Sequence, residues 1–321
     1  MKYDRLFSVM AEHTLRYGEN PHQDGVFLEI ESDDPLALQR FVKLQGKEVS
    51  FNNYLDMDGA LYGIAQIGTE RPACVVIKHT NPCGAAVADD IVEAYRRAWE
   101  GDSLAAFGGI IAVNRPVTAE LAEAMVADRK FFEVLLAPEV EPEAAKILGA
   151  KTDLRVLVNP ALLNPNQPTD TDVKKVRGGY LVQPQDAMVV TASDLQVVTE
   201  VEPTPQQVAD LLFAWQVCRA SKSNTIVIAK DGMLVGSGVG QQDRKRCCEL
   251  AVGKSAGRSV GAVAASDAFF PFPDGPQVLI DGGVKAIIQP GGSIRDKDTI
   301  DLCNRRGVAM VLNGGIRCFR H

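Results

Sequence analysis

The feature that most constrains the fold is a regular alternation of apolar runs and helix-like segments between residues 73 and 158. The apolar runs are ACVVIK, GGIIAV, FEVLLA and LRVLV, which are short and rich in branched aliphatic residues. The segments between them are DIVEAYRRAWEG, TAELAEAMVADRK and EPEAAKILG, in which apolar side chains recur every three or four positions. This order is typical of βαβ units, so we expect a layered α/β unit with a mostly parallel sheet.

The same alternation returns in the second half of the chain. TPQQVADLLFAWQVCRASKS predicts a long amphipathic helix with a capping box, because Gln207 stands three residues after the cap Thr204. Strand-like runs follow in NTIVIA, VGAVAAS, VKAIIQ and VAMVL. Residues 159–195 are rich in Pro, Asn, Asp and Thr and predict a long connection. We therefore divide the chain into two α/β units, residues 1–195 and 196–321, whose similar strand-to-loop patterns hint at a duplication.

Composition argues against several classes of function. The chain has 321 residues, of which 46% are hydrophobic, and a formal net charge of −7. It can bury a large core, but it has no general attraction to polyanions. No apolar run approaches the roughly 18 residues of a membrane span, and the opening MKYDRLFSVM is too polar for a signal peptide. We expect a cytoplasmic protein that binds small molecules rather than nucleic acid or membranes.

The cysteine pattern argues against disulfides and zinc. Seven cysteines are scattered through apolar or helical stretches, which is typical of reduced core thiols. The sequence contains no C-x-x-C and no H-x-x-x-H pair, so the usual zinc spacings are missing. KHTNPCG has the outline of a zinc-deaminase motif, but Asn81 replaces the required glutamate and Ala86 the second cysteine. A deaminase fold without its metal remains an alternative.

The segment VVIKHTNPCG contains the strongest catalytic candidates. Its apolar run predicts a buried strand, and Lys78 and His79 stand where that strand ends, before a turn at Asn81-Pro82. An imidazole can move a proton near neutral pH, and a lysine can stabilise negative charge on a reacting oxygen. From the residues alone, the alternative is a solvent-facing lysine and a histidine that caps a turn.

Three further segments contain residues suited to ligand binding. LRYGENPHQ places Arg16 and Tyr17 in a turn-rich stretch, where an arginine can bind phosphate with two hydrogen bonds. DAFFPFPDG places Phe269 and Phe272 among prolines and aspartates, and such aromatics can line a pocket for a planar ligand. GSGVGQQD precedes a helix and could bring backbone N–H groups to an anion. Each segment also has a structural interpretation: a surface turn, satellite core packing and a tight hairpin, respectively.

Taken together and in this order, the segments resemble the transformylase part of the AICAR transformylase/IMP cyclohydrolase family of purine biosynthesis. The matching segments are LRYGENPHQ, KHTNPCG, AFGGI, EVLLAP, SKSNT, GVGQQDR, SVGAVAASDAFFPFPDG, GGSIRDKD and IRCFRH. The resemblance implies transfer of a formyl group from the co-substrate 10-formyltetrahydrofolate to the 5-amino group of the nucleotide AICAR. It also implies a fold of two cytidine-deaminase-like α/β units without zinc.

The resemblance implies roles for individual residues. Lys78 is assigned to proton transfer or oxyanion stabilisation, and His79 to orienting the carboxamide and helping the proton off. Glu133 stands where some relatives have aspartate. The residues that match contacts to the AICAR nucleotide are Arg16, Tyr17, Gly108, Glu133, Asn224, Phe269 and Arg317. The residues that match folate contacts are Phe272 and Asp274, with Arg244 and Ser293 as weaker candidates.

Further implications of the resemblance concern ions and partners. Some relatives hold a potassium ion near residues that match Thr225 and Asp267, so potassium is a candidate here. The resemblance implies a homodimer in which His79 and Asn224 meet across a two-fold interface. Only 14 residues precede Leu15, so we expect this chain to lack a cyclohydrolase domain and to work beside a separate IMP cyclohydrolase. The alternative functions are a divergent nucleobase deaminase and a purine-nucleotide sensor without turnover.

Overall fold

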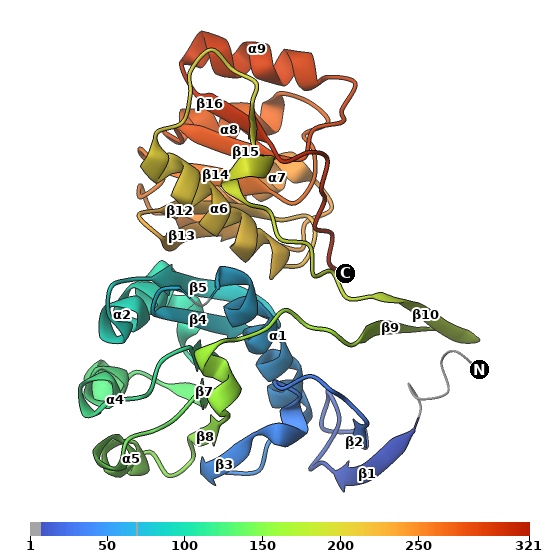
Figure 1. Ribbon diagram of the computed structural model, residues 1–321, viewed down its shortest axis with the longest axis vertical. Helices are drawn as coiled ribbons and strands as arrows, with labels where there is room; N and C mark the ends of the chain where they lie inside the picture. Colours follow the sequence, from blue (N-terminus) through green and yellow to red (C-terminus); the bar gives the residue numbers. More distant parts are fainter. Residues whose placement is uncertain (1–7, 69) are drawn as a thin grey trace.

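A computed structural model describes residues 8–68 and 70–321 of the chain (Figure 1). The first half begins with a hairpin of β1 (Val9–Thr14) and β2 (Val26–Ile30). The following elements are β3 (Val42–Gln45), α1 (Phe51–Ile67), β4 (Ala73–Lys78), β5 (Asn81–Val87), α2 (Ile91–Gly101), α3 (Ser103–Ala106), β6 (Gly109–Val113), α4 (Ala119–Val126), β7 (Phe132–Ala137), α5 (Pro142–Gly149) and β8 (Arg155–Val158).

The second half contains the same kinds of element. A hairpin of β9 (Thr171–Val176) and β10 (Gly179–Pro184) precedes it. The following elements are β11 (Gln196–Val197), α6 (Pro205–Arg219), β12 (Ile226–Lys230), β13 (Met233–Gly238), α7 (Arg244–Lys254), β14 (Val263–Ser266), α8 (Asp274–Asp281), β15 (Ala286–Gln289), α9 (Asp296–Arg306) and β16 (Ala309–Leu312). Short 3₁₀ helices lie at Leu38–Arg40, Ala127–Arg129, Pro160–Leu163 and Ala192–Asp194.

Both halves contribute to one 12-stranded sheet, in the order β11-β16-β15-β14-β12-β13-β5-β4-β6-β7-β8-β3. Only the runs β6-β7-β8 and β14-β15-β16 are parallel. The expectation of a mostly parallel sheet is therefore wrong, and β4 pairs antiparallel with both of its neighbours. The apolar run of β4 indicates that the strand is buried on both faces. A central strand of a mixed sheet and a strand of a parallel sheet are both buried in this way, so the run does not distinguish them.

The strand pairings repeat from one half to the other. In the first half, β4 pairs antiparallel with β5 and β6, and β8 pairs antiparallel with β3. In the second half, β12 pairs antiparallel with β13 and β14, and β16 pairs antiparallel with β11. The expected duplication is thus present in the topology, with β5 and β13 meeting antiparallel at the middle of the sheet. The division of the chain at residues 195 and 196 stays a prediction.

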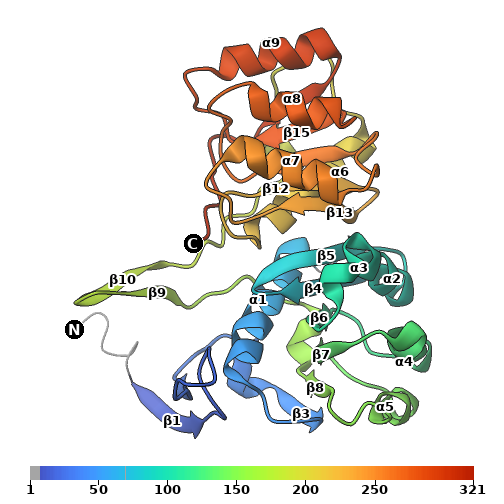
Figure 2. The same cartoon turned by 180° about the vertical axis from the view of Figure 1, so that it is seen from behind.

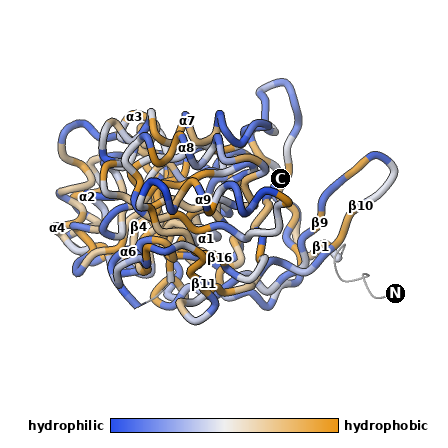
Figure 3. The backbone as a smooth tube through the Cα atoms, turned by 90° about the horizontal axis from the view of Figure 1, so that it is seen from above, coloured by the Kyte–Doolittle hydropathy of each residue, from blue (hydrophilic) through white to orange (hydrophobic). Residues whose placement is uncertain are grey.

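Helices cover both faces of the sheet. Helices α1 and α6 pack together on one face, and α2, α3, α4, α5, α7, α8 and α9 cover the opposite face (Figures 1 and 2). Helix α6 begins as predicted, because Thr204 and Gln207 cap it reciprocally. The hydrophobic segments gather in the sheet, whereas α9 and the loops are more hydrophilic (Figure 3). All seven cysteines are buried and unpaired, which confirms the expected core thiols.

Residues 159–195 are more ordered than a plain connection. They contain the β9-β10 hairpin, which projects from the body of the molecule (Figure 2). The β-branched and aromatic residues of TDVKKV and GYLVQP favour the two strands, and Gly178, with a φ of 81°, supplies the turn between them. Within residues 8–68 and 70–321, no helix is both long enough and apolar enough to cross a membrane.

Candidate active site

Lys78 and His79 lie at the edge of the sheet where β4 turns into β5. Lys78 pairs with Asn81, so His79 and Thr80 form a two-residue hairpin turn. Both turn residues have a positive φ, 50° for His79 and 63° for Thr80. This conformation suits the glycine and asparagine common in such turns, and it is rare for a β-branched threonine. The turn leaves the His79 side chain exposed to solvent.

The Lys78 ammonium group lies against Gly108. Its Nζ donates to the carbonyl oxygen of Gly108 at 2.9 Å and faces that of Phe107 at 3.4 Å. Gly108 has a φ of 71°, and a Cβ atom there would lie 3.0 Å from Nζ. Glycine therefore gives the backbone conformation and leaves the space that the lysine needs. The structure thus places two of the predicted site residues in direct contact.

Glu133 lies on the neighbouring strand, close to the same edge. Gly109 and Phe132 are register partners at the start of β6 and β7, and the N–H of Gly108 donates to the Phe131 carbonyl oxygen at 2.7 Å. The Glu133 carboxylate accepts a hydrogen bond of 2.9 Å from Nδ2 of Asn53, at the start of α1. It also lies 3.7 Å from Nη1 of Arg155. These contacts hold the carboxylate beside the first turn of α1.

Arg16 and Tyr17 lie on the loop between β1 and β2, and they contact each other. Nη2 of Arg16 lies 3.0 Å from the Tyr17 hydroxyl, and its guanidinium carbon is 4.7 Å from the ring centroid. The loop reaches the start of α1, where Nδ2 of Asn52 donates to the Glu19 carbonyl oxygen at 3.2 Å. In the described part of the chain, neither Arg16 nor Tyr17 contacts another predicted site residue.

The second half contributes a cavity of about 340 Å³. It lies beyond the end of β14 and beside the first turns of α7 and α8. The guanidinium carbon of Arg317 stacks 4.9 Å from the Phe269 ring centroid. Ser293 is not part of this lining, although its neighbour Arg295 lies 5.1 Å from the Phe272 ring centroid. The predicted residues that line the cavity are Asn224, Arg244, Phe269, Phe272, Asp274 and Arg317.

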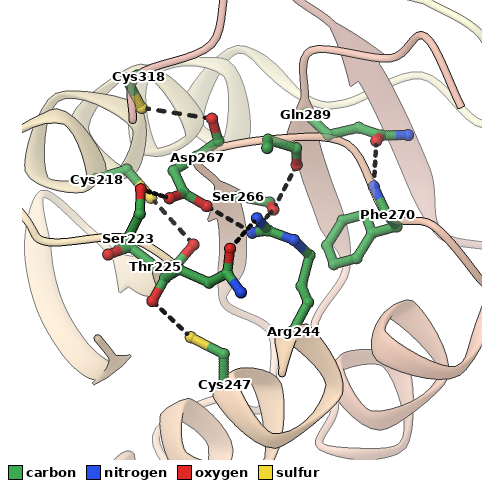
Figure 4. Close-up of polar contacts among 12 residues, drawn as sticks. Cys218, Ser223, Thr225, Arg244, Cys247, Ser266, Asp267, Phe270, Gln289 and Cys318 are labelled. Atoms are coloured by element: carbon green, nitrogen blue, oxygen red, sulfur yellow. Dashed lines mark hydrogen bonds and ion pairs between the residues drawn. The ribbon is translucent and has the colours of Figure 1, made fainter. Parts of the chain in front are cut away.

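A buried ion pair lies beneath this cavity (Figure 4). Nη1 of Arg244 donates to Oδ1 of Asp267 at 2.5 Å, and both side chains are buried. The same guanidinium donates to the Ser266 hydroxyl at 2.9 Å and to Oδ1 of Asn224 at 2.7 Å. Oδ2 of Asp267 accepts from the Ser223 hydroxyl at 2.5 Å. Arg244 is therefore a wall of the cavity that fixes Asn224, and three of its hydrogen bonds go to protein atoms.

The His79-Thr80 turn and the cavity lie at the same edge of the sheet. The side-chain oxygen of Asn81 accepts from the backbone N–H of Lys222 at 2.9 Å. The Lys222 carbonyl in turn accepts from Gly240 at 2.9 Å, and Asn224 is only two residues away. Because β5 and β13 run antiparallel, the turn after β4 and the segment before β12 come to the same edge.

Comparison with known proteins identifies the family of this chain. Residues 2–254 match the model of one protein family, described as the AICARFT/IMPCHase bienzyme. The chain belongs to this family. A "Bifunctional purine biosynthesis protein PurH" from Caldicellulosiruptor bescii is 47% identical over 99% of this chain. Proteins of the same name from Nostoc sp. PCC 7120 and Nostoc punctiforme are 44% and 45% identical over 96% of it. The chain spans about three fifths of their lengths: 61%, 59% and 58%, respectively.

The contacts around Asp267 bear on the predicted potassium ion. Both carboxylate oxygens of Asp267 already accept hydrogen bonds, one from Arg244 and one from Ser223. The Thr225 hydroxyl donates to the Lys222 carbonyl at 2.5 Å. The guanidinium supplies the positive charge that a buried carboxylate requires, so these contacts lend a potassium ion no support. Potassium near Thr225 and Asp267 stays a prediction.

Two polar contacts of the site were not foreseen. Oδ1 of Asp56, on α1, accepts from the backbone N–H of Thr80 at 2.6 Å. Asn81 was expected only to form a turn, yet it also links the turn to Lys222. Asp56 lies within an ordinary helical pattern and its partner is 24 residues away, so no local signal in the sequence marks it.

Two of the three glycines of GSGVGQQD are explained by packing. Gly236 and Gly238 lie within β13, beneath α7. A Cβ atom on Gly236 would be 2.3 Å from the Ala251 carbonyl oxygen, and one on Gly238 would be 2.1 Å from that of Cys247. The close approach of helix and strand thus explains these two glycines without an anion, and anion binding by this segment stays a prediction.

Proposed function

We propose that this chain is an AICAR formyltransferase, which transfers the formyl group of 10-formyltetrahydrofolate to the 5-amino group of AICAR. The observation that carries the proposal is the convergence of two sets of residues at one edge of the sheet. Lys78 and His79 come from the first half, and the lining of the cavity comes from the second. The products are tetrahydrofolate and formyl-AICAR.

The chemistry explains why a lysine and a histidine stand together. The aromatic amine of AICAR is a poor nucleophile, because its lone pair is delocalised toward the carboxamide. The amine nitrogen attacks the formyl carbon, a tetrahedral oxyanion forms, and the bond from that carbon to N10 of the folate then breaks. The amine loses one proton and N10 gains one. His79 orients the carboxamide and helps the proton off, while Lys78 stabilises the oxyanion or moves a proton.

The residues around the pair fit the two substrates. Arg16 and Arg317 are exposed and suited to the nucleotide phosphate. Phe269 offers a ring face to the planar imidazole. Phe272 and Asp274, at the mouth of the same cavity, are placed for the pterin of the folate. Asn224 reaches the nucleotide from a position that Arg244 holds, and the other nucleotide contacts are Tyr17, Gly108 and Glu133.

We also propose that the enzyme is a homodimer whose sites are shared between chains. Exposed apolar side chains occur beside both parts of the site. Phe107 and Phe131 lie next to Gly108, and Phe272 and Phe319 line the cavity. A second copy of the chain would cover such side chains. Because each chain presents both parts of the site at one edge, a two-fold contact along that edge would let the His79 turn of one copy meet the Asn224 cavity of the other.

A spectrophotometric assay of tetrahydrofolate release, with and without AICAR, tests the proposed reaction. We expect release by the purified chain only when AICAR is present, and formyl-AICAR in equal amount. His79→Ala, made and purified in parallel, controls for contaminating activity. No AICAR-dependent release, under conditions in which an authentic transformylase is active, would refute the reaction. Ammonia release with stoichiometric zinc would instead indicate a deaminase, and nucleotide binding without product would indicate a sensor.

A further inference from the structure

The His79-Thr80 turn adopts a backbone conformation that its own residues disfavour. Both residues are in the left-handed region, which costs a non-glycine residue on the order of 1–2 kcal/mol. Such conformations persist only where surrounding contacts hold them. The position of the His79 side chain follows directly from this turn. The contacts that hold the turn therefore determine where the imidazole is placed.

Asp56 provides the strongest of these contacts. It lies in the second turn of α1 and is partly buried, and its Oδ1 accepts from the Thr80 N–H at 2.6 Å. Burial raises the pKa of the Asp56 carboxyl, and the hydrogen bond from Thr80 opposes that rise. On the other side of the turn, Nδ2 of Asn81 donates to the His79 carbonyl at 2.9 Å. The turn is thus held through both of its residues.

The helix beneath the turn leaves room for it. A Cβ atom on Gly59 would lie 3.3 Å from the carbonyl oxygen and 3.4 Å from the Cα atom of Thr80. Glycine within a helix lowers stability by roughly 0.5–1 kcal/mol relative to alanine. This loss occurs where α1 passes under the turn and a larger side chain would crowd Thr80. The close approach brings the Asp56 carboxylate within hydrogen-bond distance of the backbone.

The corresponding hairpin of the second half has the same device. Its turn is Asp231-Gly232, and the N–H groups of both residues donate to the Asp210 carboxylate at 2.9 and 2.8 Å. Asp210 is the sixth residue of α6, as Asp56 is of α1. The carboxylate clamp is therefore a property of the duplicated unit, but only in the first half does it hold a histidine.

We propose that Asp56 is a positioning residue for formyl transfer: its carboxylate holds the Thr80 N–H and thereby fixes the His79 imidazole relative to Lys78. This role rests on the proposed function. It uses the hydrogen bond rather than the negative charge, so Asp56→Asn, which keeps an Oδ1 acceptor, should act differently from Asp56→Ala. The contact is to the backbone, so a structural readout of the clamp exists that does not depend on turnover.

The test compares Asp56→Ala, Asp56→Asn and the matched control Asp210→Ala. We expect Asp56→Ala to lower kcat roughly 10- to 100-fold, with KM for AICAR changed less than about threefold. Asp56→Asn should stay within about fivefold of the wild-type kcat, because a neutral acceptor makes a weaker bond of the same geometry. Asp210→Ala removes the other clamp and should lower stability while kcat is retained. Asp210→Asn replaces it if the alanine variant does not fold.

Hydrogen exchange measured by mass spectrometry separates this proposal from the proposed function. The peptide that contains Thr80 should exchange faster in Asp56→Ala than in the wild type, and the rate in Asp56→Asn should lie close to the wild type. Unchanged exchange, or a folded Asp56→Ala with wild-type kcat, would overturn the positioning role. The positioning role would also be overturned if Asp56→Asn lowered kcat as much as Asp56→Ala and shifted the pH profile of kcat, because the negative charge of Asp56 would then be the property required. If the wild type has no AICAR-dependent transfer, the proposed function fails, and the exchange rates still decide whether the clamp exists.

Discussion

The two halves of the molecule place different residues at corresponding positions of the same topology. Asn114 follows β6 and Asp267 follows β14, and the N–H of each donates at 3.3 Å to a carbonyl at the start of the neighbouring strand. The acceptors are Ala73, the first residue of β4, and Thr225, just before β12. The Asn114 side chain only completes the backbone, since its Oδ1 accepts from the Ala73 N–H at 2.7 Å. Asp267 instead pairs with Arg244 beneath a cavity. One strand end satisfies backbone groups, and the other contains a buried ion pair beside a cavity.

The adjacent helices differ in the same way. Asp90 caps α2 and Asp243 caps α7, and the first helical residue after each cap is buried. That residue is Ile91 in the first half and Arg244 in the second. An apolar contact in one unit is thus an ion pair in the other.

The hairpin turns show the opposite distribution. The second half has Asp231-Gly232, residues typical of a two-residue hairpin, whereas the first half has the disfavoured His79-Thr80. Each half therefore keeps one plain element and one specialised element. Because β5 and β13 run antiparallel, the specialised turn of one half and the specialised strand end of the other lie at the same edge. A duplication can thus form one composite site from two unlike halves.

The largest expected effect comes from making the second half resemble the first. Arg244→Ile should lower the free energy of unfolding by about 3–5 kcal/mol, because it leaves the buried Asp267 carboxylate unpaired. The double variant Arg244→Ile with Asp267→Asn restores the Ile91 and Asn114 combination, and should recover most of that stability without recovering formyl transfer. Urea denaturation and the transferase assay measure both. A double variant as unstable as the single one would show that the two positions are not equivalent.

The next effect concerns the specialised turn. Lys78→Ala and His79→Ala should each lower kcat on the order of 100-fold or more, while AICAR binding changes little. Arg317→Ala should mainly raise KM for AICAR. Asp231→Ala, in the plain turn of the other half, serves as the control and should leave kcat unchanged. Normal turnover by a folded His79→Ala variant would show that the His79-Thr80 turn is no more important for kcat than the Asp231-Gly232 turn.

A smaller effect, on stability, is expected from relieving the backbone strain at Thr80. Thr80→Gly should raise the free energy of unfolding by roughly 1 kcal/mol, because glycine adopts a φ of 63° without a steric penalty. The backbone N–H of residue 80, which donates to Asp56, is still present in this variant. Thermal and chemical denaturation beside the wild type give the comparison. A loss of stability would mean that the threonine side chain makes contacts that outweigh the backbone strain.

The smallest effect is a dependence of stability on pH. Burial raises the pKa of Asp56, so the native state holds that proton more tightly than the unfolded chain does. The stability contributed by Asp56 is therefore lost as pH rises from the ordinary pKa of about 3.9 through the native pKa. Asp56→Asn does not titrate there, so its stability relative to the wild type should increase over that window. Urea denaturation at a series of pH values would contradict this if the difference stayed constant or decreased.

Local sequence determined much of what could be predicted. The capped start of α6 at Thr204, the central apolar strands and the Lys78-His79 pair each follow from neighbouring residues. The directions of β4 and β12 do not, because a buried strand has the same apolar pattern in either direction. The Asp56 contact to Thr80 also escaped prediction, since it joins a helix to a turn across the fold. The resemblance selected Arg244 as a folate contact, but its bonds to Asp267 and Asn224 required the structure.

Subunit mixing tests most directly whether the two halves supply one composite site between chains. Inactive His79→Ala chains are mixed with inactive Asn224→Ala chains and allowed to exchange. In a shared arrangement, each heterodimer has one doubly damaged site and one intact site. Activity should then recover to roughly a quarter of the wild type, given random pairing and independent sites. No recovery, with heterodimers confirmed by mass spectrometry, would contradict the shared site.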